Sequence, residues 1–546
     1  MSYPNFGMSF FYKLSLYFHT IRYLKPVQIS NRIWRRLSSR EVSKNQLAGY
    51  CLPSINLAPS FSRRPSMIGR LEFKFLNQSG FIENPSDWNS EAFPKLWLYN
   101  LHYFDDLNAH SSEQRQDWHH QLIERWVDEN PPFVGTGWEP YPTSLRIVNW
   151  IKWLLKGNQA TEKMQVSLAL QARFLAKNIE YHILGNHLFS NGKALCFAGK
   201  VFEGEEASGW SELGLKIITQ EIEEQVLTDG GHFERSPMYH NLFLEDVLDL
   251  YNLLNLPSLK ATALKMLPVS RELCHPDGEI PLFNDAAFSI APNYQELSAF
   301  SKQLGIEFDF NQENQCTKFF SNLGYLKMNK GAAVLFCDFA PVGPNYLPGH
   351  AHADTLSFEL SVFGQRLIVN SGTSQYGDGE SRAWERSTSA HTTVEVNKSN
   401  SSEVWGGFRV AKRAQVFDIS IKDGESFSAS AGHDGYKKIH NGPIHRREFI
   451  LSFEKIIVKD RLIDGQLHNA VARYYFAPDT NIELFDATSG VIFHLGKKLR
   501  WRIEGGKARL KSAYYSPEFG LRVENTCLEC EFLDRDLDFE LRWETH

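Results

Sequence analysis

The segment GHAHADTLSFEL (residues 349–360) places two histidines and an aspartate directly before a run of apolar alternation. Side chains alternate between the two faces of a strand, so His350, His352, Asp354 and Leu356 would share one face if the segment is extended. Imidazoles at the end of a buried row need partners, which can be hydrogen bonds, a metal or a substrate. We therefore expect this end of the segment to reach a functional site.

Two further polar clusters lie at the ends of expected helices. The stretch ILGNHLFSNGKAL (183–195) carries Asn186 and His187 at the junction of two helical patterns. The stretch 229–246 is a turn broken by Gly and Pro before a helix, and its polar residues are His232, Glu234, Arg235, Tyr239 and His240. Each has a plainer interpretation as a cap, turn or core residue. Their convergence at element ends of two domains favours a shared pocket.

A third cluster joins His352 to Asn370, in RLIVNSGT, and His391, in RSTSAHTTVEV. Two imidazoles and an oxygen ligand suit zinc, with water as the fourth ligand. Asp354 is an alternative ligand, or a residue that orients one imidazole by a hydrogen bond. The spacing alone does not decide between these interpretations.

The elements that must position these residues change in character along the chain. From about residue 114 to 310 apolar residues recur at intervals of three and four, which is typical of amphipathic helices. The clearest stretches are 143–157, 161–184, 208–231 and 241–257. After about residue 318 the chain turns to short alternating or β-branched stretches separated by Gly, Asn and Asp. No helical pattern separates these, so we expect antiparallel, sandwich-like sheets.

The chain has 546 residues, too many for a single ordinary core. We predict an α+β multidomain protein with its main boundary near residues 315–325, where the composition changes. The predicted units are a basic N-terminal segment packed on the helical domain (1–60), a helical domain (61–317) and an antiparallel β-sandwich domain (318–546).

Charge is distributed unevenly along the chain. The net charge is -6, yet residues 1–50 hold eight Lys or Arg against one Glu, a local charge of +7 that leaves about -13 for the remainder. An acidic body argues against nucleic acid or a densely sulfated polyanion as the main partner. The basic, aromatic-rich start could contact an anionic membrane surface, or it could be a helical strap over the acidic domain.

Targeting signals are weak. No apolar run reaches the length of a membrane span, and the N-terminal stretch lacks the charge order and cleavage site of a signal peptide. The seven Cys are scattered, with a single CxxC at Cys527 and Cys530. These features predict reduced thiols and a cytoplasmic location, at the inner membrane face if the basic start binds lipid.

The sequence resembles the heparinase II/III-like family of polysaccharide lyases, whose relatives include heparin/heparan lyases and alginate lyases. The resemblance covers most of the chain. The blocks that carry it are LWLYNLHYFD, GWEPYPTSLRIVNWIKWL, GNHLFSNGKALCFAG, GGHFERSPMYH, GHAHADTLSFEL, LIVNSGTSQY and SAHTTVEV. The family implies an incomplete (α/α) toroid followed by an antiparallel β-sandwich, with the active cleft between them.

The family's reaction is β-elimination at a uronic acid, and it implies roles for four residues. Asn186 and His187 would neutralise the C6 carboxylate, because the C5 proton is poorly acidic until they do. Tyr239 and His350 would remove the C5 proton and protonate the O4 leaving oxygen. Which of the two is the base depends on the C5 configuration and stays open.

Further site residues follow from the resemblance. Arg235 and His240 are expected beside Tyr239, where a cation would lower the phenol's pKa. The expected substrate-binding residues are Arg235, His240, Tyr141, Arg146 and Trp138, and the expected metal ligands are His352, Asn370 and His391. Relatives commonly carry aspartate where this chain has Asn370, a weaker ligand. One structural divalent metal, zinc by preference, is therefore an open expectation.

The predicted function is a lyase acting on an anionic, uronate-containing polysaccharide, such as a bacterial exopolysaccharide or capsule-type glycan. Two alternatives remain. A metal-assisted glycan hydrolase would need an open coordination site and a carboxylate base, for which Glu234 or Asp354 could serve. A non-catalytic glycan-binding protein of an assembly pathway would keep the fold alone. Endo or exo action, C5 epimer preference and oligomeric state are not encoded in any recognisable motif.

Overall fold

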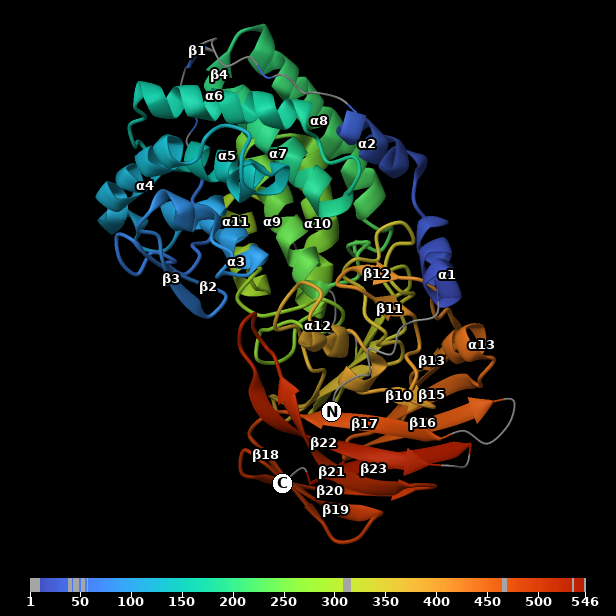
Figure 1. Ribbon diagram of the computed structural model, residues 1–546. Helices are drawn as coiled ribbons and strands as arrows, with labels where there is room; N and C mark the ends of the chain where they lie inside the picture. Colours follow the sequence, from blue (N-terminus) through green and yellow to red (C-terminus); the bar gives the residue numbers. More distant parts are fainter. Residues whose placement is uncertain are drawn as a thin grey trace.

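The computed structural model describes residues 10–37, 42, 49–50, 55, 57–307, 316–463, 469–532 and 535–544. Helices dominate the described chain before residue 307, and strands dominate it from residue 317 onward (Figure 1). The change falls between α11 (Tyr294–Gln303) and β5 (Thr317–Phe320), where the sequence predicts a domain boundary. The domain ranges themselves stay a prediction.

The four clearest helical stretches of the sequence correspond to four helices of the structure. These are α5 (Pro140–Leu155), α6 (Glu162–Lys177), α8 (Glu205–Gln225) and α9 (Pro237–Leu254). The other longer helices are α1 (Phe10–Ile21), α2 (Pro26–Leu37), α3 (Lys95–Tyr103), α4 (Gln116–Glu129), α7 (Gly185–Val201) and α10 (Pro257–Glu272). Neighbours in sequence pack together, α7 against α8 and α9 against α10. Buried tryptophans fill the helical core, among them Trp97, Trp126 and Trp150.

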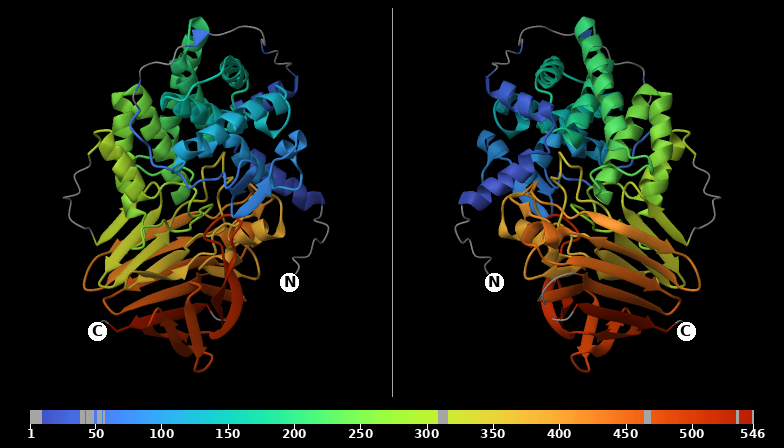
Figure 2. Two further views of the ribbon diagram at one scale, coloured as in Figure 1. Left: turned by 90° about the vertical axis from the view of Figure 1, so that its left-hand side faces the viewer. Right: turned by 90° about the vertical axis from the view of Figure 1, so that its right-hand side faces the viewer.

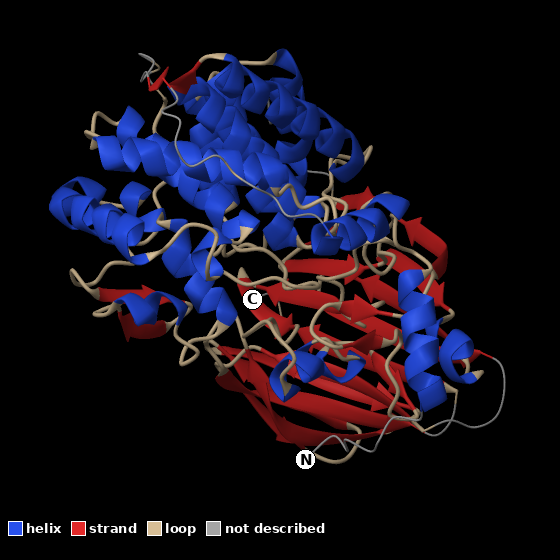
Figure 3. Cartoon of the chain, turned by 45° about the horizontal axis from the view of Figure 1, so that its top comes forward, coloured by secondary structure: helices blue, strands red, loops and turns tan. Residues whose placement is uncertain are grey.

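The β part consists of two large antiparallel sheets, which confirms the expected sheet type (Figure 3). The first follows the order β21 (Lys507–Tyr515), β22 (Val523–Phe532), β17 (Ala470–Phe476), β9 (Gln365–Val369), β8 (Phe358–Val362), β7 (Ala333–Asp338), β6 (Tyr325–Lys330) and β5, with β10 (Val394–Val396) beside β17. The second follows the order β13 (Val416–Lys422), β14 (Phe427–His433), β15 (Ile444–Leu451), β16 (Lys455–Ile463), β23 (Asp536–Trp543), β20 (Lys497–Glu504), β19 (Ser489–His494) and β18 (Thr480–Leu484).

The two sheets share one apolar core. Alternate residues of β15 and β16 are buried, as expected for strands with one face against a core. Tyr474 of the first sheet stacks on Phe539 of the second, with ring centroids 4.0 Å apart. Phe358 of the first sheet likewise meets Phe449 of the second at 5.3 Å.

Small elements complete the chain. They are the hairpin β2 (Glu72–Phe75) and β3 (Gln78–Phe81), the pair β1 (Gly49–Tyr50) and β4 (Phe202–Glu203), the pair β11 (Val404–Trp405) and β12 (Arg409–Val410), and the short helices α12 (Glu380–Glu385) and α13 (Gly435–His440). No helix within the described ranges is both long and apolar enough to cross a membrane. Both views of Figure 2 show the helices of the first half lying together above the stacked strands.

The N-terminal helices contact both parts of the molecule. On α1, Thr20 accepts a hydrogen bond from Trp405 Nε1 at 3.1 Å, and Tyr17 packs edge-on against the same indole. On α2, the Gln28 amide donates to the carbonyls of Ile183 and Tyr346, each at 3.3 Å. The predicted packing of this segment on the helical domain did not include the α1 contact with β11, because no local sequence pattern indicates where an aromatic face will pack.

Candidate active site

Two helix N-termini open onto the same cavity. The first turn of α7 carries Asn186 and His187, and it begins at Gly185, whose φ is +60°. A Cβ on Gly185 would lie 2.3 Å from a side-chain carbon of Leu347, so glycine permits the close approach of the β part. The first turn of α9 carries Tyr239, whose backbone N–H donates to Ser236 Oγ at 3.2 Å as an N-cap.

Tyr239 and His350 lie face to face. Their ring centroids are 4.0 Å apart, and the Tyr239 hydroxyl is 3.1 Å from the hydroxyl of Tyr376. Burial raises the pKa of Tyr239 well above its usual value, and the neighbouring phenol of Tyr376 raises it further. The phenol of Tyr239 therefore keeps its proton at neutral pH.

Asp285 holds His350 from behind. His350 Nδ1 lies 2.9 Å from Asp285 Oδ2, and His352 Nε2 lies 2.8 Å from Asp285 Oδ1. Both Nη atoms of Arg382 donate to the same carboxylate, and Nη2 lies 2.7 Å from Asp285 Oδ2. Although burial opposes ionisation, the Arg382 guanidinium and the two imidazoles hold the pKa of Asp285 well below its usual range. An ionised Asp285 fixes the proton of His350 on Nδ1, which leaves Nε2 as the basic nitrogen.

Glu234 is the second carboxylate next to His350. It is fully buried, and Glu234 Oε2 lies 3.5 Å from His350 Nε2, longer than a normal hydrogen bond. Burial raises the pKa of Glu234, and the backbone N–H of Asn186, together with a positive charge on His350 once it is protonated, would offset part of that rise. The lone pair of His350 Nε2 therefore remains available to accept a proton. The carboxylate of Glu234 is close enough to stabilise the imidazolium that forms.

His187 is stacked and anchored beside Asn186. Its ring lies 4.2 Å from the ring of Tyr141, and its Nδ1 lies 3.1 Å from Glu180 Oε1. Asn191 donates to the other oxygen of Glu180 at 3.1 Å, which fixes that carboxylate. Because Nδ1–H donates to Glu180, His187 can offer a second donor at Nε2 only as an imidazolium, whose charge the Glu180 carboxylate would balance.

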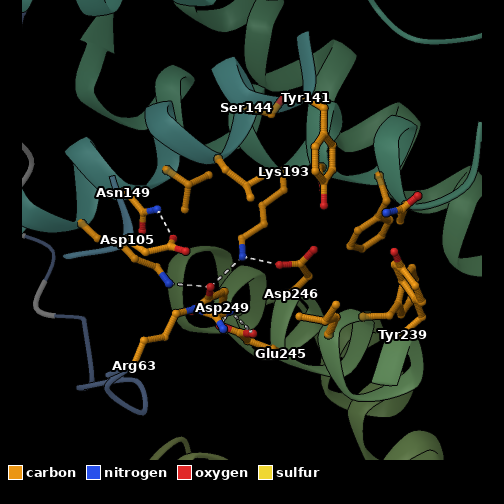
Figure 4. A pocket seen from close by; sticks show the side chains of 18 of the residues that line it. Arg63, Asp105, Tyr141, Ser144, Asn149, Lys193, Tyr239, Glu245, Asp246 and Asp249 are labelled. Carbon is orange, nitrogen blue, oxygen red and sulfur yellow. Dashed lines mark hydrogen bonds and ion pairs between the residues drawn. The ribbon is translucent and has the colours of Figure 1, made fainter. Parts of the chain in front are cut away.

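The cavity lies between α5, α7 and α9 and leaves a volume of about 110 Å³ for the centres of water-sized molecules (Figure 4). Tyr141, Asn186 and Tyr239 line it, together with a network of charged side chains deeper in the helical part. Figure 4 shows the hydroxyls of Tyr141 and Tyr239 facing the same space as Asp246. The structure thus brings together five of the expected residues: Asn186, His187, Tyr239, His350 and Tyr141.

Trp138 and Arg146 are placed elsewhere, which corrects their expected contact with substrate. Trp138 is buried, and its indole donates to Asn130 O at 3.3 Å. Arg146 is fully buried and donates to Gln171 at 2.8 Å. Both belong to the aromatic core, because their side chains leave α5 and the turn before it on the side away from Tyr141.

Arg235 and His240 also point away from the cavity. His240 follows Tyr239 by one helical step, which turns its ring toward α10, where Nε2 lies 3.2 Å from Met266 O. Burial lowers the pKa of His240 to about 4, so it supplies no positive charge to Tyr239. The Arg235 guanidinium donates to Phe233 O at 2.9 Å and to Asn322 O at 3.2 Å. The expectation that these residues lower the phenol's pKa is wrong.

The opening motif also differs from the expected strand. Strand β8 begins only at Phe358, and Leu356 has a left-handed φ of +64°. The same-face argument therefore fails for His350 and His352. Their different surroundings arise from a loop: the side chain of His350 is 15% exposed and packs on Tyr239, which lines the cavity, whereas that of His352 is fully buried.

Three important residues have no local sequence signal. Asp285 and Arg382 lie in irregular or short segments, 97 residues apart, and form a buried ion pair. Tyr376 sits in LIVNSGTSQY, but no periodicity marks it as a neighbour of Tyr239. The segment PLFNDAAF (281–288) contains no motif that would indicate that its aspartate binds two histidines.

The expected zinc ligands fit a metal only in part. His352 Nδ1 and His391 Nε2 are 3.2 Å apart, a separation that suits two ligands of one zinc or a hydrogen bond between neutral rings. Burial lowers the pKa of His352 to about 4 and that of His391 to about 3, so both rings are neutral. Asn370 Oδ1, however, accepts the Thr392 N–H at 3.1 Å. Within the described ranges no three His, Cys, Asp or Glu are placed to hold a metal. The residues present do not complete a zinc site.

Two family models together match most of the chain. Residues 97–306 match the heparinase II/III N-terminus, and residues 312–541 match the C-terminal region of heparinase II/III-like proteins. A heparin-sulfate lyase from Bacteroides stercoris is 32% identical over 246 residues, which cover 40% of this chain and 37% of that protein. A heparin-sulfate lyase from Bacteroides thetaiotaomicron is 26% identical over 408 residues, which cover 64% and 55%. The chain thus spans about a third to a half of the length of these curated relatives.

Solved structures have the same fold. A heparinase III structure superposes with a TM-score of 0.70 at 17% identity, over 97% of this chain and 90% of that one. A heparan sulfate lyase from Pedobacter heparinus superposes with a TM-score of 0.57 at 17% identity, over 90% and 85%. These similarities establish the arrangement of helical and antiparallel β parts.

Proposed function

The chain belongs to the heparinase II/III-like family, and from this premise we propose that it is a polysaccharide lyase that cleaves a uronic-acid-containing polysaccharide by β-elimination. The observation that carries the proposal is the contact between the Tyr239 phenol and the His350 imidazole, beside the amide of Asn186. A proton donor, a base and a carboxylate-binding amide at one cavity are the groups that this reaction requires.

The first task is to make the C5 proton acidic. In the proposed reaction the side chains of Asn186 and His187 donate hydrogen bonds to the C6 carboxylate, whose negative charge grows as the C5–H bond breaks. Glu180 and Asn191 hold His187 from the other side, which keeps that donor in place. The C5 carbanion is thereby stabilised as an enolate-like anion.

The second task is proton transfer. His350 Nε2 takes the C5 proton, and the resulting imidazolium lies between Asp285 and Glu234. The electron pair forms the C4–C5 double bond and expels O4, which takes the proton of Tyr239. The raised pKa of Tyr239 supports its role as the acid, because a phenol that holds its proton has one to give.

The position of the two rings supports a preference for one C5 epimer. Rings with centroids 4.0 Å apart leave no space for a sugar between them, so the substrate must meet both from one side. The C5 proton and O4 lie on the same face of a glucuronate-type unit and on opposite faces of its C5 epimer. We therefore propose syn elimination and a glucuronate-type substrate.

A panel of uronate polymers tests the proposal. Elimination leaves a double bond conjugated to the carboxylate, which absorbs in the ultraviolet. We expect this absorbance with glucuronate-type polymers, including bacterial exopolysaccharide or capsule-type glycans. New reducing ends without it would support a hydrolase instead, and binding without cleavage would support a glycan-binding protein; either result would reject the lyase.

Two structural expectations join the proposal. The pairwise packing of consecutive helices supports an incomplete (α/α) toroid around the cavity. Although the residues beside His352 and His391 do not complete a zinc site, a zinc ion held there would have a structural role, and none of the chemical steps above requires it. Metal analysis of the purified protein tests that expectation.

We also propose that α1 and α2 contact an anionic membrane surface. Residues 10–37 contain no Asp or Glu, and exposed apolar side chains cluster there, with Phe11 78%, Phe18 63% and Ile33 55% exposed. Amphipathic helices with aromatic and basic residues bind such surfaces. We expect co-sedimentation with phosphatidylglycerol vesicles and its loss in Phe11→Ser/Phe18→Ser, but not in Phe485→Ser, a change of an equally exposed phenylalanine of the β part. Self-association in place of vesicle binding would reject this role.

A further inference from the structure

Beyond the proton-transfer residues, one side of the cavity is lined by both positively and negatively charged side chains, which we call the charged wall: Arg63, Asp105, Lys152, Lys193, Glu245, Asp246 and Asp249. Lys193 Nζ lies 2.6 Å from both Asp246 and Asp249 (Figure 4). Lys152 Nζ lies 2.5 Å from Asp249. These carboxylates outweigh the desolvation of Lys193 and raise its pKa, so the ammonium stays charged. Both lysines are fully engaged within the protein.

The remaining charges of the wall are paired in the same way. Arg63 Nη2 lies 2.9 Å from Glu245 Oε2, and the Asn149 amide donates to Asp105 at 2.7 Å. The described lining thus holds three Lys or Arg side chains and four Asp or Glu side chains. Each of these cations already has a carboxylate partner, and the wall as a whole is negative or neutral.

A wall of this kind discriminates between ligands by charge. A sulfate or a second carboxylate needs cations or N–H donors that are not already engaged, and here it would face carboxylates instead. A hydroxyl group can accept from Lys193 and donate to Asp246 at once, so a neutral sugar satisfies the wall without breaking its ion pairs. His232, which is buried in the same lining, also has Nδ1 without a hydrogen-bond partner among the described residues.

We propose that this cavity is a subsite for an uncharged, hydroxyl-rich sugar next to the uronate that is cleaved, and that it excludes a sulfated sugar. The cavity shares Tyr239, Tyr141 and Asn186 with the reacting site, so a sugar bound in it would adjoin the uronate that is cleaved. The inference rests on the proposed lyase function and specifies its substrate class: a glucuronate polymer whose neighbouring residues are not sulfated.

Two polymers with one backbone test this subsite. The first alternates glucuronate with N-acetylhexosamine, and the second is the same polymer after chemical N-deacetylation and N-sulfation. We expect kcat/KM to be about 100-fold higher for the unsulfated polymer, the scale that like-charge contacts reach at interfaces. Equal rates, or a faster reaction with the sulfated polymer, would overturn the inference while leaving the lyase function intact.

A variant that removes one charge from the wall tests whether the wall causes the preference for the unsulfated polymer. Asp246→Asn removes one partner of Lys193 at a side chain that is 26% exposed, so folding should tolerate it. We expect this variant to lower the ratio of kcat/KM for the unsulfated polymer to kcat/KM for the sulfated polymer by at least roughly tenfold, because the reaction with the sulfated polymer improves. Asp128→Asn, which removes a Lys163 partner on α4 away from the cavity, is the matched control and should leave the ratio unchanged. An unchanged ratio in Asp246→Asn would overturn the inference.

Binding separates the inference from the proposed reaction. If the wild type cleaves neither polymer, the lyase proposal fails on this substrate class, and calorimetry with the two corresponding oligosaccharides still measures the preference of the cavity. Tighter binding of the unsulfated oligosaccharide supports the subsite, and equal or tighter binding of the sulfated one overturns it.

Discussion

Replacing Tyr239 with phenylalanine tests the proposed proton donor most directly. The change deletes one oxygen atom, which is 3.1 Å from the Tyr376 hydroxyl, and leaves the ring stacked on His350. Loss of a general acid lowers a rate by about 10²- to 10⁴-fold. That loss corresponds to roughly 3 to 5 kcal/mol of transition-state stabilisation.

Tyr376→Phe is the matched control, because the two variants delete the same hydrogen bond. One such bond contributes about 0.5 to 1.5 kcal/mol to stability, so both variants should shift the urea midpoint equally and slightly. Only Tyr239→Phe also removes the proton donor. We therefore expect Tyr376→Phe to retain activity within roughly tenfold of the wild type, since about 1.4 kcal/mol corresponds to a factor of ten.

The assay is the initial rate of ultraviolet absorbance on a glucuronate-type polymer, with folding checked by circular dichroism. Two results would refute the reasoning. Tyr239→Phe could retain a rate within tenfold of the wild type, so that the phenol is not the acid. Alternatively, both variants could lose activity equally, which would show that the rate depends on the hydrogen bond between Tyr239 and Tyr376 and not on proton donation by Tyr239.

Three further predictions concern charge. Asp285→Asn should destabilise the protein by about 3 to 5 kcal/mol, because Arg382 stays buried without its counter-charge. The double variant Asp285→Asn/Arg382→Met should recover part of that loss. Urea midpoints measure the stability of both variants, and full stability of the single variant would contradict the role of the ion pair. Burial raises the pKa of Glu221 to about 7, above its unfolded value near 4.3, so its contribution to stability is complete below about pH 4.3 and is lost as the pH rises through 7. Glu221→Gln should therefore gain stability relative to the wild type at pH 8 but not at pH 4, whereas an equal difference at both pH values would show that the carboxyl is not perturbed. Asn370→Asp should tighten zinc binding in calorimetry, because it replaces the neutral amide of the predicted ligand set by an anionic carboxylate, and unchanged affinity would exclude a metal role for Asn370, His352 and His391.

Periodic patterns predicted the helices that carry the site. The apolar spacing in 241–257 marks most of α9, but it leaves Tyr239 in the turn before the helix, whereas Ser236 is the N-cap and Tyr239 lies in the first helical turn. Helix ends were less accurate: α6 ends at Lys177, although the apolar pattern continues to residue 184. In the turn that follows, Ile179 and Leu184 are buried by tertiary contacts, and a local pattern cannot distinguish such contacts from a further helical turn.

Side-chain direction was predictable only where a nearby element constrained it. Trp138 and Arg146 share a sequence block with Tyr141, yet they face the core because the aromatic cluster around Trp126 lies on their side of α5. The charge pairs that line the cavity join α5, α7 and α9 to Arg63, and each partner is more than 50 residues away. A sequence gives the charges of such a wall but not their pairing, and the pairing decides whether a cation is left for a ligand.

The geometry of the proposed reaction depends on one loop residue that no motif marks. The backbone carbonyl of Asp285 accepts from Ser236, the N-cap of the helix that carries Tyr239, and its backbone N–H donates to the carbonyl of His350. Its side chain holds the ring of the same histidine. Asp285 therefore contacts both the cap of the helix that carries Tyr239 and the residue that carries the imidazole, and so sets the distance between phenol and imidazole. Arg382 fixes the orientation of its carboxylate. This explains why the irregular segment 349–357 can position His350 without a strand: the constraint is supplied across the interface between the helical and β parts.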